Sequence, residues 1–138
     1  MKSILIVDDE PTIRRLVRAA LDGRGYRLLE AADGPSALET ARRERPDLVL
    51  LDLALPQLSG TEVCRRLKEA PATADIPVLL LTGMAQHTKR GAAQTAGAQG
   101  CIEKPFSPRA LTAQIAELLE EAPAPAAMRR FLESFTYD

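Results

Sequence analysis

The sequence predicts an α/β domain built on a doubly wound parallel β-sheet with helices on both faces. Short apolar segments alternate with helical patterns five times along the chain. Three of the apolar segments are nearly continuous aliphatic runs, which are typical of parallel strands buried on both sides. Because consecutive parallel strands need right-handed crossovers, this alternation places helices on both faces of one sheet.

Five segments are predicted as strands. The first, third and fourth in the chain are the aliphatic runs. The second and fifth mix polar with apolar residues, which favours positions nearer the sheet edges. In chain order the five segments are residues 3–7, 26–31, 47–51, 76–81 and 98–102.

Helical patterns connect these strands, and Gly and Pro mark their limits. The first pattern ends near Gly23. The second opens at Asp33 and stops before Pro46, and the third begins at Gly60 and ends at Pro71. The first helix is expected to bury one apolar stripe, formed by Ile13, Leu16, Val17, Ala20 and Leu21.

The last two helical patterns differ in composition. The fourth, residues 87–96, offers mostly Ala and Gly, so we expect a weakly anchored and mobile helix. The fifth begins at Ser107-Pro108, and its apolar residues are expected to be buried: Leu111, Ile115, Leu118 and Leu119.

The composition is that of one soluble globular domain. The chain has 138 residues, of which 46% are hydrophobic and 27% charged. A net charge of -1, from 18 basic and 19 acidic residues, argues against a nucleic-acid-binding domain. No apolar run approaches the roughly 20 residues of a membrane helix. The N-terminus also lacks the pattern of a secretory signal, so we expect a cytoplasmic protein without membrane contact.

The few sulfur and imidazole side chains do not form a metal-binding pattern. Cys64 and Cys101 have neither metal nor redox spacing, and His87 is the single histidine. We expect both cysteines to be buried free thiols in a reducing compartment, and His87 to be an exposed polar residue.

Polar side chains follow four of the predicted strands. The first strand is followed by Asp8-Asp9-Glu10, the third by Asp52, the fourth by Thr82 and the fifth by Lys104. In a doubly wound sheet the carboxyl ends of the strands form the binding edge, so we expect these side chains to share one rim. Each residue alone has an ordinary explanation, such as a helix cap or a surface charge. Their joint occurrence favours a functional site.

Carboxylates that converge on one pocket need a compensating cation. Two unit charges 4 Å apart repel each other by roughly 4 kcal/mol at an effective dielectric constant near 20. Carboxylate oxygens without His or Cys suit a hard ion, and Mg²⁺ is the physiological default. Mg²⁺ beside a lysine and a hydroxyl is suited to handling a phosphoryl group, because the three neutralise or donate to its oxygens.

These residues, in this order and at these strand ends, resemble the receiver domain of bacterial two-component response regulators. The resemblance rests on Asp8-Asp9, Asp52, Thr82 and Lys104-Pro105-Phe106, and it covers about residues 2–121. It implies a flavodoxin-like (βα)5 fold with strand order 2-1-3-4-5. It also implies a phosphorylation-dependent signalling switch, in which Asp52 accepts a phosphoryl group from the phosphohistidine of a sensor kinase or phosphotransfer protein.

The resemblance further implies a Mg²⁺ site. Asp9 and Asp52 would bind the ion directly, together with the backbone carbonyl of Ala54, while Asp8 would act through water. Lys104 would pair with the phosphoryl oxygens.

Three more features follow from the same resemblance. The peptide bond between Lys104 and Pro105 would be cis. Thr82 would donate a hydrogen bond to the phosphoryl group once it is attached. The protein would catalyse its own phosphorylation and slow dephosphorylation only, and would not be an enzyme with an external substrate.

The chain departs from the family pattern at three positions. Many receivers carry an aromatic residue three positions before the pocket lysine, where this chain has Cys101. A thiol cannot sweep the volume of a ring, so we interpret Cys101 as a small core residue, with a redox role as the alternative. Ala54 and Met84 occupy the two positions that tune dephosphorylation, and neither can activate water, which predicts slow hydrolysis.

Residues 122–138 are predicted to lie outside the receiver domain of residues 1–121. Ala-Pro-Ala-Pro at 122–125 is typical of a short semi-rigid linker. The rest is too short for an output domain, so we expect no direct DNA binding by this chain. Its apolar residues recur at helical spacing, and they are Met128, Phe131, Leu132 and Phe135. They would either pack on the same domain, or dock in a groove of a partner or of a second copy of the chain, which would give a homodimer.

Two other functions remain open on the sequence. A phosphatase with an aspartyl nucleophile has similar architecture, but it needs an acid two residues after the nucleophile, where this chain has Ala54. A module that keeps only the fold would not need the complete set of pocket residues.

Overall fold

The computed structural model describes residues 1–83 and 97–120. The expected fourth helix at residues 87–96 and the segment 122–138 both lie outside the described residues. The described part holds one five-stranded sheet and four helices.

All five strands are parallel, and their order is β2-β1-β3-β4-β5. This confirms the predicted fold class, and the two strands of mixed composition lie at the two edges. The strands are β1 Ser3–Val7, β2 Arg27–Ala31, β3 Leu48–Asp52, β4 Val78–Thr82 and β5 Gly100–Glu103.

The third, fourth and fifth strands begin one or two residues later than predicted and end one residue later. Pro77 precedes β4 and lacks the N–H that a ladder residue donates. Asp47 precedes β3, where its carboxylate accepts a hydrogen bond from the backbone N–H of Ser3 at 2.8 Å. As a result β3 includes Asp52 and β4 includes Thr82, so both residues are held by the sheet itself.

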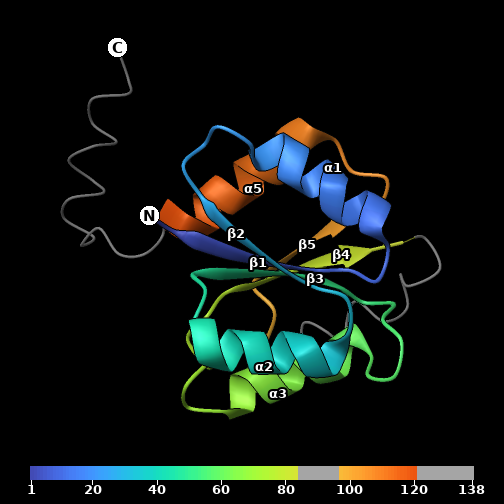
Figure 1. The fold of residues 1–138 in the computed structure, drawn as a ribbon, viewed down its shortest axis with the longest axis vertical. Helices are drawn as coiled ribbons and strands as arrows, with labels where there is room; N and C mark the ends of the chain where they lie inside the picture. Colours follow the sequence, from blue (N-terminus) through green and yellow to red (C-terminus); the bar gives the residue numbers. More distant parts are fainter. Residues whose placement is uncertain (84–96, 121–138) are drawn as a thin grey trace.

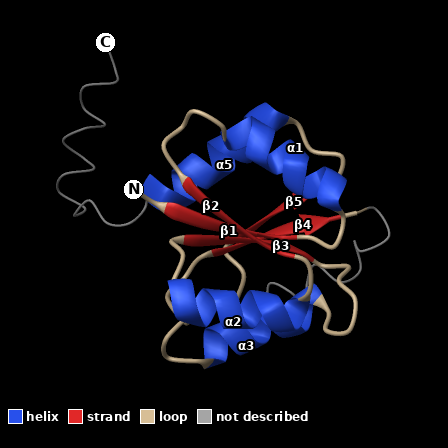
Figure 2. Cartoon of the chain, viewed as in Figure 1, coloured by secondary structure: helices blue, strands red, loops and turns tan. Residues whose placement is uncertain are grey.

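The helices cover both faces of the sheet, as Figure 1 and Figure 2 show. Helices α1 Pro11–Leu21 and α5 Pro108–Glu120 pack on one face, and α2 Gly34–Glu44 and α3 Gly60–Glu69 on the other. Successive strand residues point to opposite faces, so the central strands supply two core layers. On β1, for example, Ile4 and Ile6 face α1 and α5, while Leu5 and Val7 face α2 and α3.

The expected apolar stripe of α1 is only partly correct. Val17 and Leu21 are buried, but 54% of Leu16 is exposed. A helix turns by about 100° per residue, so a stripe of five positions is wider than the surface that one neighbouring layer covers. On α5, Leu111, Ile115 and Leu119 are buried as predicted, and Leu118 is partly buried.

Helix α3 begins directly against the end of β3. The side chain of Ser59 caps the helix by accepting a hydrogen bond from the N–H of Glu62 at 3.3 Å. A Cβ atom on Gly60 would lie 2.3 Å from the backbone oxygen of Asp52, well inside van der Waals contact. Only glycine therefore lets α3 approach the strand end this closely.

Within residues 1–83 and 97–120, no helix has the length and apolar character needed to cross a membrane.

Candidate functional site

The sheet brings four predicted site residues to one edge. Asp8 follows β1, Asp52 and Thr82 end β3 and β4, and Lys104 follows β5. Asp52 is paired in register with Leu81, so Thr82 lies one residue beyond it on the neighbouring strand. The backbone N–H of Lys104 donates to the carbonyl oxygen of Thr82 at 2.6 Å, which joins the end of β5 to this edge.

Lys104 connects the two buried carboxylates. Its Nζ lies 2.9 Å from Oδ2 of Asp8 and 3.4 Å from Oδ1 of Asp52. Asp8 is fully buried and 3% of Asp52 is exposed. The peptide bond between Lys104 and Pro105 is cis, as the resemblance implied. The ion pair between Asp8 and Lys104 was not predicted, because the sequence gives no distance between residues 96 positions apart.

The Asp52 carboxyl has an unusual acidity. Burial, followed by the negative charge of Asp8, raises its pKa from 3.8 to about 6. The charge of Lys104 and the N–H of Ala54, which donates to Oδ1 of Asp52 at 3.2 Å, oppose this rise. At neutral pH the carboxylate is therefore still mainly ionised, and it keeps an elevated affinity for a cation or a proton.

The Lys104 ammonium remains charged in this setting. Burial lowers its pKa, but the hydrogen bond to Asp8 and the charges of Asp52 and Asp8 together raise it by more than burial lowers it. The pKa of Lys104 therefore lies above its usual value. The site thus contains one fixed positive charge between two buried carboxylates.

An acidic cluster formed by Asp8, Asp9 and Glu10 lies at the end of β1. One carboxylate oxygen of each residue lies within 4.8 Å of the others, with Asp8 buried and the other two exposed. The N–H of Glu10 donates to Oδ1 of Asp8 at 2.9 Å, which holds the turn. An all-oxygen donor set that is open to solvent on one side fits Mg²⁺, which keeps several of its waters.

This cluster differs in membership from the predicted ligand set. Glu10 was noted at the end of the first strand but was not predicted as a ligand, although its place beside Asp9 in the sequence was the available signal. Asp52 is not a member of the three-residue cluster, and it is linked to Asp8 through Lys104. Ala54 is exposed beside Asp52.

The Thr82 hydroxyl is fully buried and has no hydrogen-bond partner within the described ranges 1–83 and 97–120. A buried polar group without a partner costs roughly 1–3 kcal/mol. Such a group at the edge where the carboxylates meet is poised to donate to an acceptor that arrives from outside the chain.

Two other expectations concern this side of the molecule. The expectation that both cysteines are buried is correct for Cys64 and wrong for Cys101, which lies on the edge strand β5 and is only partly buried, against the core layer under α2 and α3. Met84 and His87 lie outside the described residues.

Comparison with known proteins agrees with this arrangement. The family model described as response regulator receiver domain matches residues 4–116. The phosphate regulon transcriptional regulatory protein PhoB of Pseudomonas aeruginosa is 43% identical over 118 residues, covering 86% of this chain and 52% of that protein. The alkaline phosphatase synthesis transcriptional regulatory protein PhoP of Bacillus subtilis is 38% identical over 121 residues, covering 88% and 49%. The chain thus spans about half the length of the curated relatives it matches.

Solved structures are similar in the same region. A putative response regulator from Chloroflexus aurantiacus is 33% identical with a TM-score of 0.82, covering 86% of this chain and 98% of that one. The receiver domain of a sensor histidine kinase from Pseudomonas aeruginosa, with a magnesium ion coordinated in its active site cleft, is 30% identical with a TM-score of 0.80 and the same coverage. The chain therefore belongs to the response regulator receiver domain family of two-component systems, and receiver domains are phosphorylation-dependent signalling switches.

Proposed function

We propose that Asp52 is the phosphoryl acceptor of this switch, and that Lys104 and Thr82 act on the transferred group. The observation that carries the proposal is the shared edge, where the buried Asp52 carboxylate lies 3.4 Å from the Lys104 ammonium. One residue further in register lies the buried Thr82 hydroxyl, which has no hydrogen-bond partner among the residues that the structure describes.

The reaction uses the ionised carboxylate as a nucleophile. One Asp52 oxygen bonds to the phosphorus of a phosphohistidine while the phosphorus–nitrogen bond breaks, and its electron pair stays on the imidazole nitrogen. A pKa of about 6 leaves most Asp52 side chains ionised at neutral pH. Lys104, which lies against Asp52, stabilises the negative charge on the oxygens of the group in transfer.

The phosphorylated state supplies partners that the resting state lacks. The group adds about -1.5 to -2 charge and new acceptor oxygens at Asp52. The Thr82 hydroxyl gains an acceptor, and Lys104 gains phosphoryl oxygens in competition with Asp8. These interactions exist only in that state, so they shift the equilibrium between two arrangements of the neighbouring chain.

We propose Mg²⁺ as the cofactor, since the donor set fits it. Asp9 and Asp52 would hold the ion with the backbone carbonyl of Ala54, and Asp8 would act through water. The ion would neutralise charge on the phosphoryl oxygens. Glu10, whose carboxylate belongs to the acidic cluster, adds a fourth acidic group near this position.

Partners and outcome follow from the same chemistry. The phosphoryl donor would be a sensor histidine kinase or a phosphotransfer protein, and the phosphorylated domain would signal in the cytoplasm by protein contact, without binding DNA itself. Residues 1–121 would form the receiver, with 122–138 as linker and amphipathic segment. Ala54 and Met84 offer no group to activate water, so hydrolysis of the acyl phosphate would be slow.

Incubation with Mg²⁺ and acetyl phosphate, followed by intact-protein mass spectrometry, tests the proposal. We expect a gain of one phosphoryl group, lost in Asp52→Asn and in chelator, but kept in Glu62→Gln, a surface control on α3. Many turnovers of a phosphate ester would instead indicate the phosphatase alternative. No mass gain under any condition would indicate a module that keeps the receiver fold without accepting a phosphoryl group.

A further inference from the structure

A cavity of about 410 Å³ lies at the edge of the sheet opposite the candidate site. The residues that line it come from the segments that precede β1, β3, β4 and β5 and from the last turn of α5. The floor is apolar, and it is formed largely by Pro46, Ile76, Pro77, Leu118 and Leu119. A volume of this size is in the range that accepts bulky side chains or a small ligand.

The chain continues from the mouth of this cavity. Leu118 and Leu119 line it, and α5 ends at Glu120. The 18 residues from 121 to 138 therefore start two positions after Leu119, the last residue of the lining. A tethered segment has an effective concentration in the millimolar range beside a site it can reach, so weak contacts suffice for docking.

The sequence of that segment matches the cavity in chemistry. Met128, Phe131, Leu132 and Phe135 recur at the spacing of one helical stripe, and two of the three phenylalanines of the chain are among them. An extended residue spans at most about 3.5 Å, so the eleven residues from Glu120 to Phe131 are long enough to turn back to the cavity.

Charges distinguish the two neighbouring arginines of the segment. Three charged residues line the cavity: Lys2, Asp47 and Asp75. The Asp47 carboxylate accepts a hydrogen bond from the backbone N–H of Ser3, so Asp75 is the exposed acidic group of the lining. At about 100° per residue, Arg129 falls beside the apolar stripe, whereas Arg130 falls on the opposite side of the predicted helix. Arg129 can therefore face Asp75 while the stripe faces the apolar floor, and Arg130 cannot.

We propose that residues 126–138 dock in this cavity of their own chain, with Phe131 and Phe135 on the apolar floor and Arg129 beside Asp75. In the docked state the stripe is buried and is withheld from other proteins. Release of the segment would expose both the stripe and the cavity.

Amide NMR spectra of the full chain test the proposal. We expect Phe131→Ser with Phe135→Ser to shift the amides of Ile76, Gln99 and Leu118, and to leave those of Asp9 and Ala54 at the far edge unchanged. The double variant removes two large apolar side chains from the docked stripe, so docking should weaken by roughly tenfold or more.

Charge reversal supplies the matched controls. Arg129→Glu should weaken docking roughly two- to five-fold, the range of an exposed ion pair, and Asp75→Lys should restore it in the double variant. Arg130→Glu should have no effect. Equal effects of the two arginine variants would overturn the pairing.

Two results would overturn the docking itself. One is that the phenylalanine variant leaves the amides of the cavity residues unchanged. The other is that the shifts depend on protein concentration and accompany a dimer in sedimentation velocity, which would place the segment in a second copy instead.

Discussion

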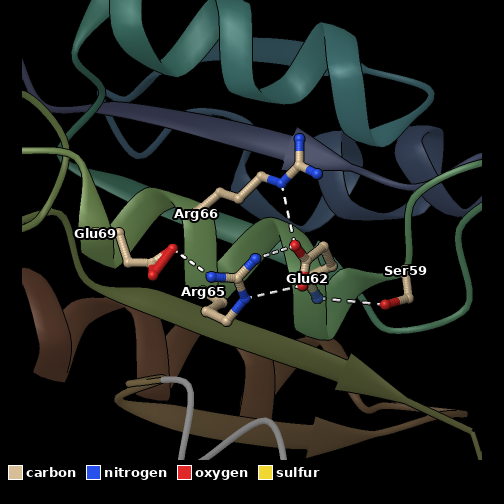
Figure 3. A network of polar contacts seen from close by, with 5 residues as sticks. All are labelled: Ser59, Glu62, Arg65, Arg66 and Glu69. Atoms are coloured by element: carbon tan, nitrogen blue, oxygen red, sulfur yellow. Dashed lines mark hydrogen bonds and ion pairs between the residues drawn. The ribbon is translucent and has the colours of Figure 1, made fainter.

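Two groups of ion pairs in this molecule use the same chemical groups in opposite surroundings. At the candidate site, Lys104 lies between Asp8 and Asp52, and both carboxylates are almost fully buried. On the surface of α3, Figure 3 shows a network in which Arg65 contacts two glutamates and Arg66 contacts one of them. The residues of that network are Ser59, Glu62, Arg65, Arg66 and Glu69.

The surroundings shift the two kinds of carboxyl in opposite directions. Burial and a like charge raise the pKa of Asp52 to about 6. Hydrogen bonds from Arg65 and then Arg66 lower the pKa of Glu62 to about 2. Exposed pairs such as those on α3 contribute little to stability because water and salt screen them. Burial of the Asp52 charge destabilises the resting state, and it also increases the tendency of this carboxylate to bind a cation or a phosphoryl group.

The largest effect is expected from Lys104→Met. It leaves Asp8 and Asp52 buried together without their cation, so the free energy of unfolding at pH 8 should fall by about 3 kcal/mol. Urea denaturation measures this change. The double variant with Asp52→Asn should recover most of the loss, and a double variant as unstable as the single one would contradict the explanation.

Asp52→Asn alone should stabilise the unphosphorylated protein. A folded-state pKa raised from 3.8 to about 6 means that ionisation of Asp52 destabilises the fold as the pH rises through this interval. In chelator at pH 8 we expect a gain of about 2 kcal/mol, which should vanish at pH 4, where the carboxyl is protonated in the folded state. Equal gains at both pH values in urea titrations would argue against burial of a charge as the cause.

Glu30→Gln tests an ion pair whose exposure is intermediate between the buried pairs of the candidate site and the exposed pairs on α3. The Glu30 carboxylate on β2 accepts a hydrogen bond from Arg14 at 2.7 Å and contacts Arg18, and its side chain is 32% exposed. The Arg18 hydrogen bond is the main cause that lowers its pKa, so the stabilisation is present above pH 4.5 and is lost as the pH falls through the folded-state pKa. We expect a loss of about 0.5 kcal/mol at pH 7. Thermal unfolding should show a smaller difference between the variant and the unsubstituted protein at pH 3 than at pH 7.

The smallest effect is expected from Arg65→Ala. The variant removes the centre of the α3 network, yet its partners stay hydrated, so the urea midpoint should remain unchanged at physiological salt. A clear drop that disappears at high salt would show that the surface network stabilises the fold more than its exposure suggests.

The sequence was sufficient for the sheet and for the positions of the site residues at its edge. Aliphatic runs and Pro or Gly limits report local chain geometry, so the strands and the positions of Asp52, Thr82 and Lys104 at strand ends could be predicted. The strand order was implied only by the resemblance to receiver domains. The pairing of Lys104 with Asp8 could not be predicted, because it depends on side-chain packing across the completed sheet.

Two further features were beyond the sequence for similar reasons. The exposure of Leu16 depends on how far α5 and the sheet extend over α1, which periodicity does not report. Lys68 Nζ donates to the carbonyl oxygens of Ala74 and Ile76, the latter at 2.5 Å, and so holds the loop before β4. A lysine in a charged helix gives no sign of such a contact.

The close approach at Gly60 has a consequence for which substitutions this chain can tolerate. Position 60 carries no reactive group, yet any larger residue there would push the start of α3 against the backbone of residue 52. Saturation mutagenesis should therefore find positions 52 and 60 almost equally intolerant of substitution. Position 52 needs a carboxylate, and position 60 has no room for a side chain. The outer surface of α3 can vary in sequence from protein to protein, provided that its first residue remains glycine.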